Sequence, residues 1–292
     1  MDEHLRTTLA DGRTVGYAEY GARGGTPVLF FHGWPASRLQ ARIVAAAAER
    51  RGVRLLALDR PGFGLSDPEP ARVLADYPPL VAAFADRLGL ARLRIIAVSG
   101  GGPYALACAS ALPERVRAVL VLCCAPPPEV LLANPRLPIG MRLLRAIYRR
   151  APDAIPAVLA VTGWGVRGLP LSPVLRIYAP GLPPPDRAVL ADPLKRALVA
   201  ESTREAFRGG AGGPLRDIQV LMARWAIDLD ALGVPVRLLY GDQDTVTPPA
   251  LCAPVFAGRP GVTLTVRAGE GHYSLPFGHG EAALAELLAL AS

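Results

Sequence analysis

The sequence predicts an α/β protein built on an open, mostly parallel β-sheet with helices on both faces. Apolar segments of strand length recur along the 292 residues, and in two stretches, 27–123 and 235–290, they alternate with segments typical of helices. Between residues 126 and 215 the strand pattern stops and proline-rich helical segments replace it. A serine at a strand–helix junction, Ser99, is the third observation, because such a junction is typical of enzymes with this kind of sheet.

The first two predicted strands form a hairpin. Residues 5–9 and 15–20 flank Ala10-Asp11-Gly12-Arg13, and the Asp-Gly pair in this segment is a strong turn signal. The next predicted strand, residues 27–31, is a continuous apolar run, as expected for a strand buried on both faces. Five further strands are expected at residues 53–58, 93–98, 116–123, 235–241 and 262–267, which makes eight in all.

The predicted helices fall between these strands. They are expected at residues 37–51, 74–88, 101–112, 249–256 and 281–290. Strand–helix–strand units of this length place parallel strands in one sheet with helices on both faces. We therefore expect a core domain of residues 1–125 and 216–292, and a helical cap of residues 126–215 with helices near 140–150 and 192–208.

The net charge of +7 is concentrated in the predicted cap. Between residues 126 and 215 there are twelve basic and six acidic residues, so this segment alone carries +6. Such a charge is consistent with a solvated helix face, or with a patch that steers an acidic substrate or carrier. We do not expect nucleic-acid binding, because no binding motif accompanies the charge.

Composition also limits location and cofactors. The chain has no run of eighteen apolar residues and its N-terminus lacks a basic, then apolar, leader, so the sequence predicts a cytoplasmic protein without a membrane span. The four cysteines lack the spacing of metal ligands and are expected to be buried free thiols: Cys108, Cys123, Cys124 and Cys252. We expect no metal and no cofactor.

Ser99 fits a nucleophile elbow. A strained turn between strand and helix requires small residues two positions before and after the serine, and Ala97 and Gly101 meet that need. A serine hydroxyl needs a base, and histidine is the natural one near neutral pH. His32 and His272 both follow predicted strands, and the carboxyl ends of parallel strands share one edge of the sheet.

An acid is also expected at this edge. Gly241-Asp242-Gln243-Asp244 follows the predicted strand at residues 235–241, and either carboxylate would orient a histidine. The remaining histidines are less suitable, since His4 lies in the N-terminal strand region and His279 is expected at the surface or as a cap near the start of the last helix.

Five motifs in order make the chain resemble the α/β-hydrolase superfamily over almost its whole length. They are His32-Gly33-Trp34-Pro35, Asp59-Arg60-Pro61-Gly62-Phe63-Gly64-Leu65-Ser66, Ala97-Val98-Ser99-Gly100-Gly101, Gly241-Asp242-Gln243-Asp244 and Gly271-His272. The resemblance implies the α/β-hydrolase fold, with an eight-stranded sheet and a cap inserted where residues 126–215 lie. It implies the triad Ser99, Asp244 and His272, with Asp244 favoured over Asp242 by its position. Ala97 departs from the glycine that usually begins the elbow.

The resemblance also implies an oxyanion hole. Its donors would be the backbone N–H groups of Trp34 and Gly100, while His32 and Gly33 would support the loop that carries Trp34. Related dehalogenases and epoxide hydrolases have aspartate as the nucleophile, so a serine at position 99 favours acyl transfer.

The function expected from these features is that of a serine hydrolase, carboxylesterase-like, acting through an acyl-enzyme at Ser99 on an ester, lactone or related acyl bond of a small, largely apolar substrate. Alternatives are a thioesterase acting on an acidic carrier or a coenzyme A thioester, an enzyme of carbon–carbon cleavage or another non-hydrolytic step, and a small-molecule binding protein. Four aromatic residues are expected either to line the pocket or to pack inside the cap: Trp164, Tyr178, Phe207 and Trp225.

Overall fold

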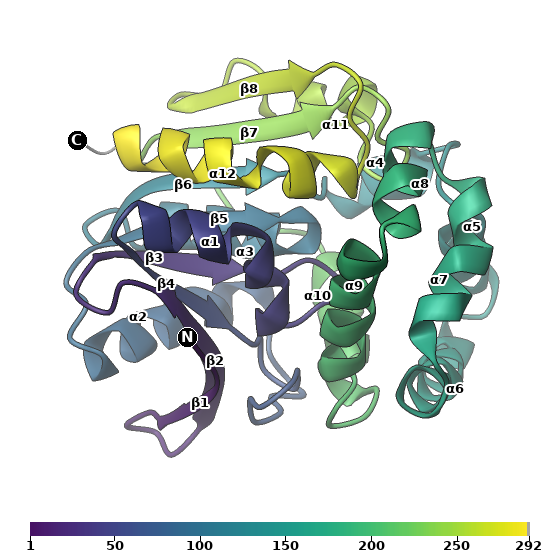
Figure 1. The fold of residues 1–292 in the computed structure, drawn as a ribbon, viewed down its shortest axis with the longest axis horizontal. Helices are drawn as coiled ribbons and strands as arrows, with labels where there is room; N and C mark the ends of the chain where they lie inside the picture. Colours follow the sequence, from purple (N-terminus) through teal and green to yellow (C-terminus); the bar gives the residue numbers. More distant parts are fainter. Residues whose placement is uncertain (291–292) are drawn as a thin grey trace.

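The computed structural model describes residues 1–290 and contains one eight-stranded sheet with the strand order β1-β2-β4-β3-β5-β6-β7-β8 (Figure 1). Strand β2 is antiparallel to β1 and to β4, and all other neighbouring strands are parallel. The strands are β1 (Asp2–Thr8), β2 (Thr14–Gly21), β3 (Thr26–Phe31), β4 (Val53–Leu58), β5 (Leu93–Val98), β6 (Val116–Leu122), β7 (Val236–Gly241) and β8 (Val262–Arg267). The predicted α/β fold class and the N-terminal hairpin are confirmed.

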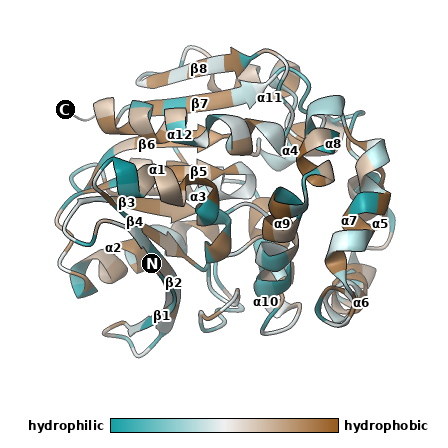
Figure 2. Ribbon diagram, viewed as in Figure 1, coloured by the Kyte–Doolittle hydropathy of each residue, from teal (hydrophilic) through white to brown (hydrophobic). Residues whose placement is uncertain are grey.

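Helices cover both faces of this sheet. On one face α1 (Arg42–Arg50) and α12 (Ser274–Ala289) pack against the central strands, and on the other face α2 (Tyr77–Arg87) and α3 (Gly102–Ala111) do so. Helix α11 (Pro249–Phe256) packs beside β8. Apolar side chains fill both interfaces, so the central strands are buried on both sides and hydrophobic along their length (Figure 2).

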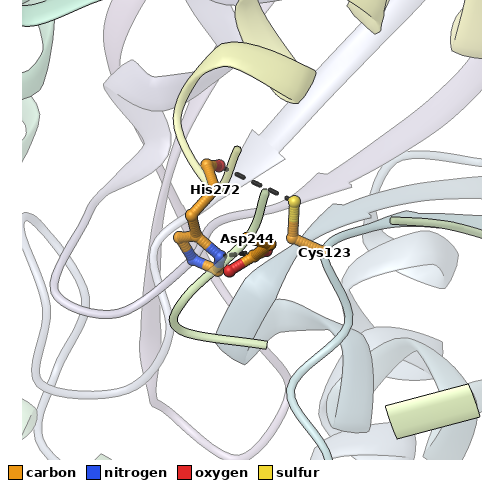
Figure 3. Close-up of side chains that lie close together, drawn as sticks. All are labelled: Cys123, Asp244 and His272. Atoms are coloured by element: carbon orange, nitrogen blue, oxygen red, sulfur yellow. Dashed lines mark hydrogen bonds and ion pairs between the residues drawn. The ribbon is translucent and has the colours of Figure 1, made fainter. Parts of the chain in front are cut away.

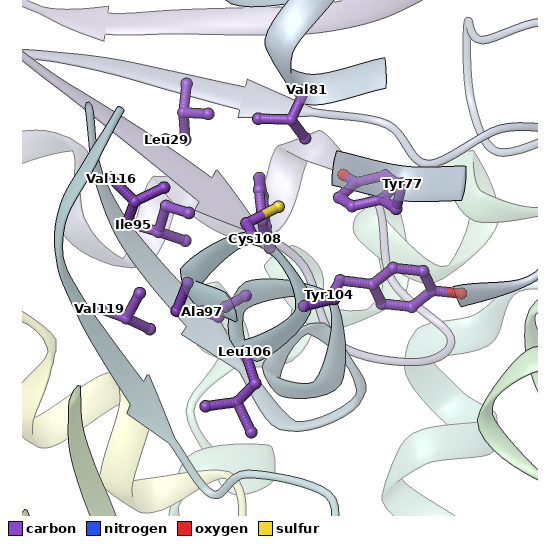
Figure 4. Close-up of a cluster of buried hydrophobic side chains, with 14 of the residues drawn as sticks. Leu29, Tyr77, Val81, Ile95, Ala97, Tyr104, Leu106, Cys108, Val116 and Val119 are labelled. Carbon is purple, nitrogen blue, oxygen red and sulfur yellow. The ribbon is translucent and has the colours of Figure 1, made fainter. Parts of the chain in front are cut away.

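The core between the sheet and α3 shows how the fold is held together. Leu29, Ile95 and Val119 project from three neighbouring strands toward Tyr104 and Cys108 of α3 (Figure 4). All five side chains are fully buried. Burying each large apolar side chain contributes about 1.5–3 kcal/mol, so this interface fixes α3, and with it the residues that precede α3, against the sheet.

Between β6 and β7, the helices from α4 to α10 form a layer that we call the cap. In the described residues this part contains helices and no strand, as the sequence predicts. The helices stand beyond the arrowheads of the strands, at their carboxyl ends (Figure 1). They are α4 (Pro128–Ala133), α5 (Ile139–Arg150), α6 (Ile155–Gly168), α7 (Leu171–Tyr178), α8 (Pro184–Ala191), α9 (Pro193–Ala206) and α10 (Gly212–Leu221). The boundary expected after residue 215 falls inside α10.

Two expectations about local structure need correction. The last helix begins at Ser274, seven residues before the expected start at Glu281, so His279 lies inside α12. Its side chain is 32% exposed, which is consistent with the expected surface position, and its Nε2 lies 3.0 Å from Glu270 Oε1. The expected helix at residues 37–51 begins as a separate 3-10 turn, Arg38–Ala41, before α1.

Other predictions can be compared directly with the structure. All four cysteines are buried and free. Within residues 1–290 no individual helix combines the length and the apolar composition needed to cross a membrane, although one bent pair of cap helices, Pro152–Gly168 with Leu171–Gly181, meets both criteria together.

Candidate active site

Ser99 lies at a sharp turn between β5 and α3. Its φ of +50° is a backbone conformation that residues with a Cβ atom rarely adopt. A Cβ atom on Gly101 would lie 2.4 Å from the carbonyl oxygen of Phe31, so only glycine fits there. The turn therefore has the geometry of the predicted nucleophile elbow, and it holds the Ser99 hydroxyl at the carboxyl end of the sheet.

The structure brings Ser99, His272 and Asp244 together although they lie up to 173 residues apart in the chain. His272 Nε2 is 3.0 Å from Ser99 Oγ, and His272 Nδ1 is 2.8 Å from Asp244 Oδ2. With the proton on Nδ1, the imidazole donates to the carboxylate and accepts from the serine hydroxyl. This arrangement allows proton transfer from Ser99 to His272.

Asp244, rather than Asp242, is the acid at this position. Asp244 Oδ1 accepts hydrogen bonds from the backbone N–H groups of Val246 and Thr247, and Oδ2 accepts one from the Thr247 hydroxyl at 2.7 Å. Burial raises the pKa of Asp244, but His272 and these donors lower it more, so the pKa lies below its ordinary value. Asp242 instead accepts from the backbone N–H of Gly269.

Two opposing effects act on the pKa of His272. Burial disfavours the imidazolium and lowers the pKa, whereas the Asp244 carboxylate raises it, and the net result is a pKa above the ordinary 6.5. The imidazolium that forms when His272 takes a proton is therefore stabilised by Asp244.

Cys123 lies beside this pair (Figure 3). Its Sγ lies 3.6 Å from the carbonyl oxygen of His272, and one ligand atom from each of Cys123, Asp244 and His272 falls within 4.8 Å of the others. However, burial raises the pKa of the Cys123 thiol well above its ordinary value, which disfavours the thiolate that binds metals, and Asp244 holds His272 Nδ1. The cluster therefore fits a hydrogen-bonded histidine–carboxylate pair better than a metal site.

Two backbone N–H groups next to Ser99 suit an oxyanion. Gly100 is in the first turn of the helical segment after Ser99, where N–H groups have no carbonyl partner within the helix. A Cβ atom on Gly100 would lie 3.4 Å from the backbone nitrogen of Trp34, so the two segments are in contact. In the described chain no backbone carbonyl accepts the Trp34 N–H.

A buried network supports the loop that carries Trp34. His32 Nδ1 lies 2.8 Å from the carbonyl oxygen of Gly33, and His32 Nε2 accepts from the backbone N–H of Arg60. Burial, together with the nearby Arg60, lowers the pKa of His32 well below its usual value, so this histidine stays neutral. The Arg60 guanidinium donates to the carbonyl oxygens of His32 and Gly33 and pairs with Asp217 of α10 at 2.8 Å. Through these two hydrogen bonds, the neutral His32 supports the loop that carries Trp34.

A cap residue, Asp186 of α8, holds the loop that carries His272. Its buried carboxylate accepts hydrogen bonds from the backbone N–H groups of His272, Tyr273 and Ser274 at 2.8–3.0 Å. These are the orphan donors at the start of α12, so Asp186 caps that helix from a distance of nearly ninety residues in the chain. Sequence reasoning identifies neither Asp186 nor Asp217, because neither residue lies in one of the motifs described above. Arg60, by contrast, belongs to the motif at residues 59–66.

Two cavities meet at Ser99 and His272. The larger, of about 260 Å³, extends under the cap and is mainly apolar. The second, of about 210 Å³, also borders Trp34 and is bounded by α9 and the start of α12. Cap residues of the larger cavity include Leu131, Leu137, Met141, Leu144, Tyr148 and Ile155. A carbonyl group beside Ser99 would thus have space on both sides.

The four aromatic residues expected near the pocket lie in different parts of the structure. Tyr178 lines the larger cavity. Trp164 is 69% exposed on the outside of α6, while Phe207 is buried in the cap with Phe63, and Trp225 packs against the core next to the sheet. Phe207 therefore takes the second of the two expected positions, inside the cap, whereas for Trp164 and Trp225 both expected positions are wrong.

Comparison with known proteins supports the fold described above. Residues 26–163 match the family model described as the alpha/beta hydrolase fold. The chain is 28% identical over 254 residues to a non-heme chloroperoxidase from Streptomyces lividans, which covers 86% of each protein.

Solved structures agree over nearly the whole chain. An enol-lactonase from Burkholderia xenovorans LB400 superposes with a TM-score of 0.71 at 16% identity, covering 98% of this chain and 100% of that one. An esterase from Rhodococcus sp. ECU1013 superposes with a TM-score of 0.70 at 17% identity, covering 99% and 100%. At such identities these two matches concern the fold. Taken with the family model and the chloroperoxidase match, they show that the chain has the alpha/beta hydrolase fold and is similar to members of that family.

Proposed function

We propose that this protein is a serine hydrolase that cleaves an ester, a lactone or a related acyl bond of a small, largely apolar substrate. The observation that carries the proposal is the hydrogen-bonded chain from Ser99 Oγ through His272 to Asp244, which opens on an apolar cavity of about 260 Å³. Carboxylic esters fit this site because the reaction needs one reacting carbonyl and two flanking groups, and a cavity lies on each side of Ser99.

The reaction follows from the positions of these groups. His272 takes the proton of Ser99 as Oγ attacks the carbonyl carbon, and the N–H groups of Trp34 and Gly100 bind the oxygen that becomes negative. His272 then gives the proton to the leaving alcohol, which departs as the acyl-enzyme forms. A water molecule, deprotonated by His272, attacks the acyl carbon, and the acid leaves as the proton returns to Ser99.

A fluorophosphonate probe and short p-nitrophenyl esters test this function. We expect the probe to label Ser99 and the esters to be hydrolysed, with a loss of about 10³–10⁶-fold in kcat for Ser99→Ala while the circular dichroism spectrum is unchanged. Labelling without ester turnover would favour a specialised acyl or carbon–carbon bond reaction, and the absence of labelling would favour a binding protein.

The thioesterase alternative depends on how the cap uses its arginines. Among those of α5, Arg145 lines the cavity, but its guanidinium donates to the carbonyl oxygens of Leu132 and Asn134 and so holds α4 in place. This engagement does not favour phosphate recognition inside the cavity. A comparison of p-nitrophenyl butyrate with butyryl-coenzyme A would decide, since a thioesterase would show the higher kcat/KM with the thioester.

A further inference from the structure

The outside of the cap carries an unusual number of exposed apolar side chains. Val161 and Trp164 are one turn apart on α6 and are 70% and 69% exposed, while Ile177 on α7 is 81% exposed. Other strongly exposed apolar residues of the cap are Ile139, Leu143, Leu169, Val174 and Leu194. Soluble surfaces rarely gather large apolar side chains in this way unless the surface binds something.

These residues lie on helices whose inner sides are already engaged. Ile155, Leu159 and Val166 of α6 are buried inside the cap, and so is Leu171 of α7. The two helices form the bent pair that meets the length and composition criteria for a membrane span, with an angle of 119° between them. Because the buried residues of α6 and α7 hold these helices in the cap, their exposed residues can contact a partner while the fold stays intact.

The same three helices, α5, α6 and α7, contain six arginines and no acidic residue. In the described chain no carboxylate pairs with the exposed arginines of these helices, which are Arg142, Arg149 and Arg150 of α5, Arg167 of α6 and Arg176 of α7. Of the acidic residues of the cap, Glu201 pairs with Arg42 and Glu205 with Arg38 of the core domain, whereas Asp153, in the turn between α5 and α6, is exposed. Figure 2 shows hydrophobic and hydrophilic residues alternating along α5 and α7, at the outer edge of the molecule.

We propose that the outer cap face, defined as the exposed side of α5, α6 and α7, docks on an anionic lipid surface. Tryptophan and aliphatic side chains favour the interfacial region of a bilayer, and arginines pair with lipid phosphates. An acidic protein would satisfy the arginines but does not require Trp164 and Ile177 to protrude. A second copy of the chain would bring two strongly positive faces together, which is unfavourable.

The position of α5 connects this surface to the cavity. Its residues Met141, Leu144 and Tyr148 line the cavity, while Ile139 and Leu143 of the same helix are exposed on the outside. A single helix thus separates the docked surface from the space above Ser99. Docking itself does not rest on the proposed hydrolase activity, and it is measured without a substrate.

Vesicle binding tests the proposal. The full chain is sedimented with vesicles of equal parts phosphatidylglycerol and phosphatidylcholine, and with vesicles of phosphatidylcholine alone. We expect binding to the anionic vesicles, a decrease of binding as salt screens the arginines, and a blue shift of tryptophan fluorescence from Trp164. The double variant Trp164→Ser/Ile177→Ser and the variant Arg142→Gln/Arg150→Gln/Arg176→Gln should each lower the partition coefficient about tenfold or more.

Matched controls lie outside the cap. Val73 is 51% exposed and Arg23 is exposed in the turn between β2 and β3, so Val73→Ser and Arg23→Gln should bind like the unchanged protein. Circular dichroism spectra and melting temperatures equal to those of the unchanged protein would show that the cap variants fold. The proposal is overturned if the protein does not bind anionic vesicles or binds neutral ones equally well. It is also overturned if the cap variants bind normally, or if the face binds only an acidic carrier protein or a second copy.

Discussion

The state of one side chain, His272, sets the expected pH dependence. The proposed reaction needs a neutral imidazole, so activity falls as the pH falls through the pKa of His272. Since Asp244 raises this pKa above 6.5, the acid limb of kcat/KM for a p-nitrophenyl ester should have its midpoint above 6.5. A midpoint below that value would contradict the electrostatic role of Asp244.

The variant Asp244→Asn separates the two effects on His272. Without the carboxylate, burial remains and lowers the pKa, so the acid limb of the residual activity should move to lower pH. The amide also favours the wrong tautomer, and kcat should fall by roughly 10³–10⁴-fold. As a control, Asp242→Asn changes the carboxylate that accepts a hydrogen bond from the backbone N–H of Gly269. This variant should leave the pH midpoint of the acid limb of kcat/KM unchanged.

Sequence reasoning at the residue scale succeeds where strand ends fix positions. Ser99, Asp244 and His272 all follow parallel strands, and the geometry of such a sheet brings them to one edge. The orientation of a cap residue has no such rule, because packing between helices decides which side of α6 faces inward. Trp164 is an example, since it points outward while Ile155 on the same helix lines the cavity.

The start of α12 shows why the ends of helices are harder to predict from sequence than the strands are. Pro276, Gly278 and Gly280 in its first two turns weaken the helix signal, so the sequence suggests a start near Glu281. The structure supplies what local sequence lacks, because the Asp186 carboxylate accepts the first N–H groups of the helix. By contrast, the strands needed no distant partner to be recognised, since their apolar runs are long and bounded by turns.

The contact between α8 and the start of α12 leads to a prediction. A Cβ atom on Gly271 would lie 2.4 Å from Asp186 Oδ1, so Gly271→Ala should displace the carboxylate and leave buried N–H groups without an acceptor. We expect the free energy of unfolding to fall by about 1–3 kcal/mol and kcat to fall as the His272 loop shifts. Thermal unfolding and ester kinetics measure both effects.

A matched control lies in the same helix. Gly278 has space for a methyl group, with the nearest atom of Glu270 at 3.6 Å, so Gly278→Ala should leave kcat unchanged and stabilise α12 by about 0.5–1 kcal/mol. Equal effects of the two substitutions would mean that Asp186 does not position the His272 loop.

For the molecule as a whole, one buried ion pair network joins the sheet, the elbow helix and the cap. Asp217 of α10 accepts hydrogen bonds from Arg60, which holds the oxyanion loop, from Arg72, and from Tyr104 of α3. Arg60 also stacks over the Tyr104 ring, with the guanidinium carbon 4.9 Å from its centre. Helix α10, which crosses the expected domain boundary, therefore ties the cap to the groups around Ser99.

Breaking this network should affect stability and activity together. Asp217→Asn leaves Arg60 and Arg72 buried without their charge partner, which typically costs about 3–5 kcal/mol, so the melting temperature should fall markedly. Because the loop carrying Trp34 loses its support, kcat should fall more than KM rises. The control Asp230→Asn removes the partner of Arg259 in an exposed pair, where the contribution is about 0–1 kcal/mol. If both variants lowered the melting temperature equally, burial of the Asp217 network would not be what stabilises the fold.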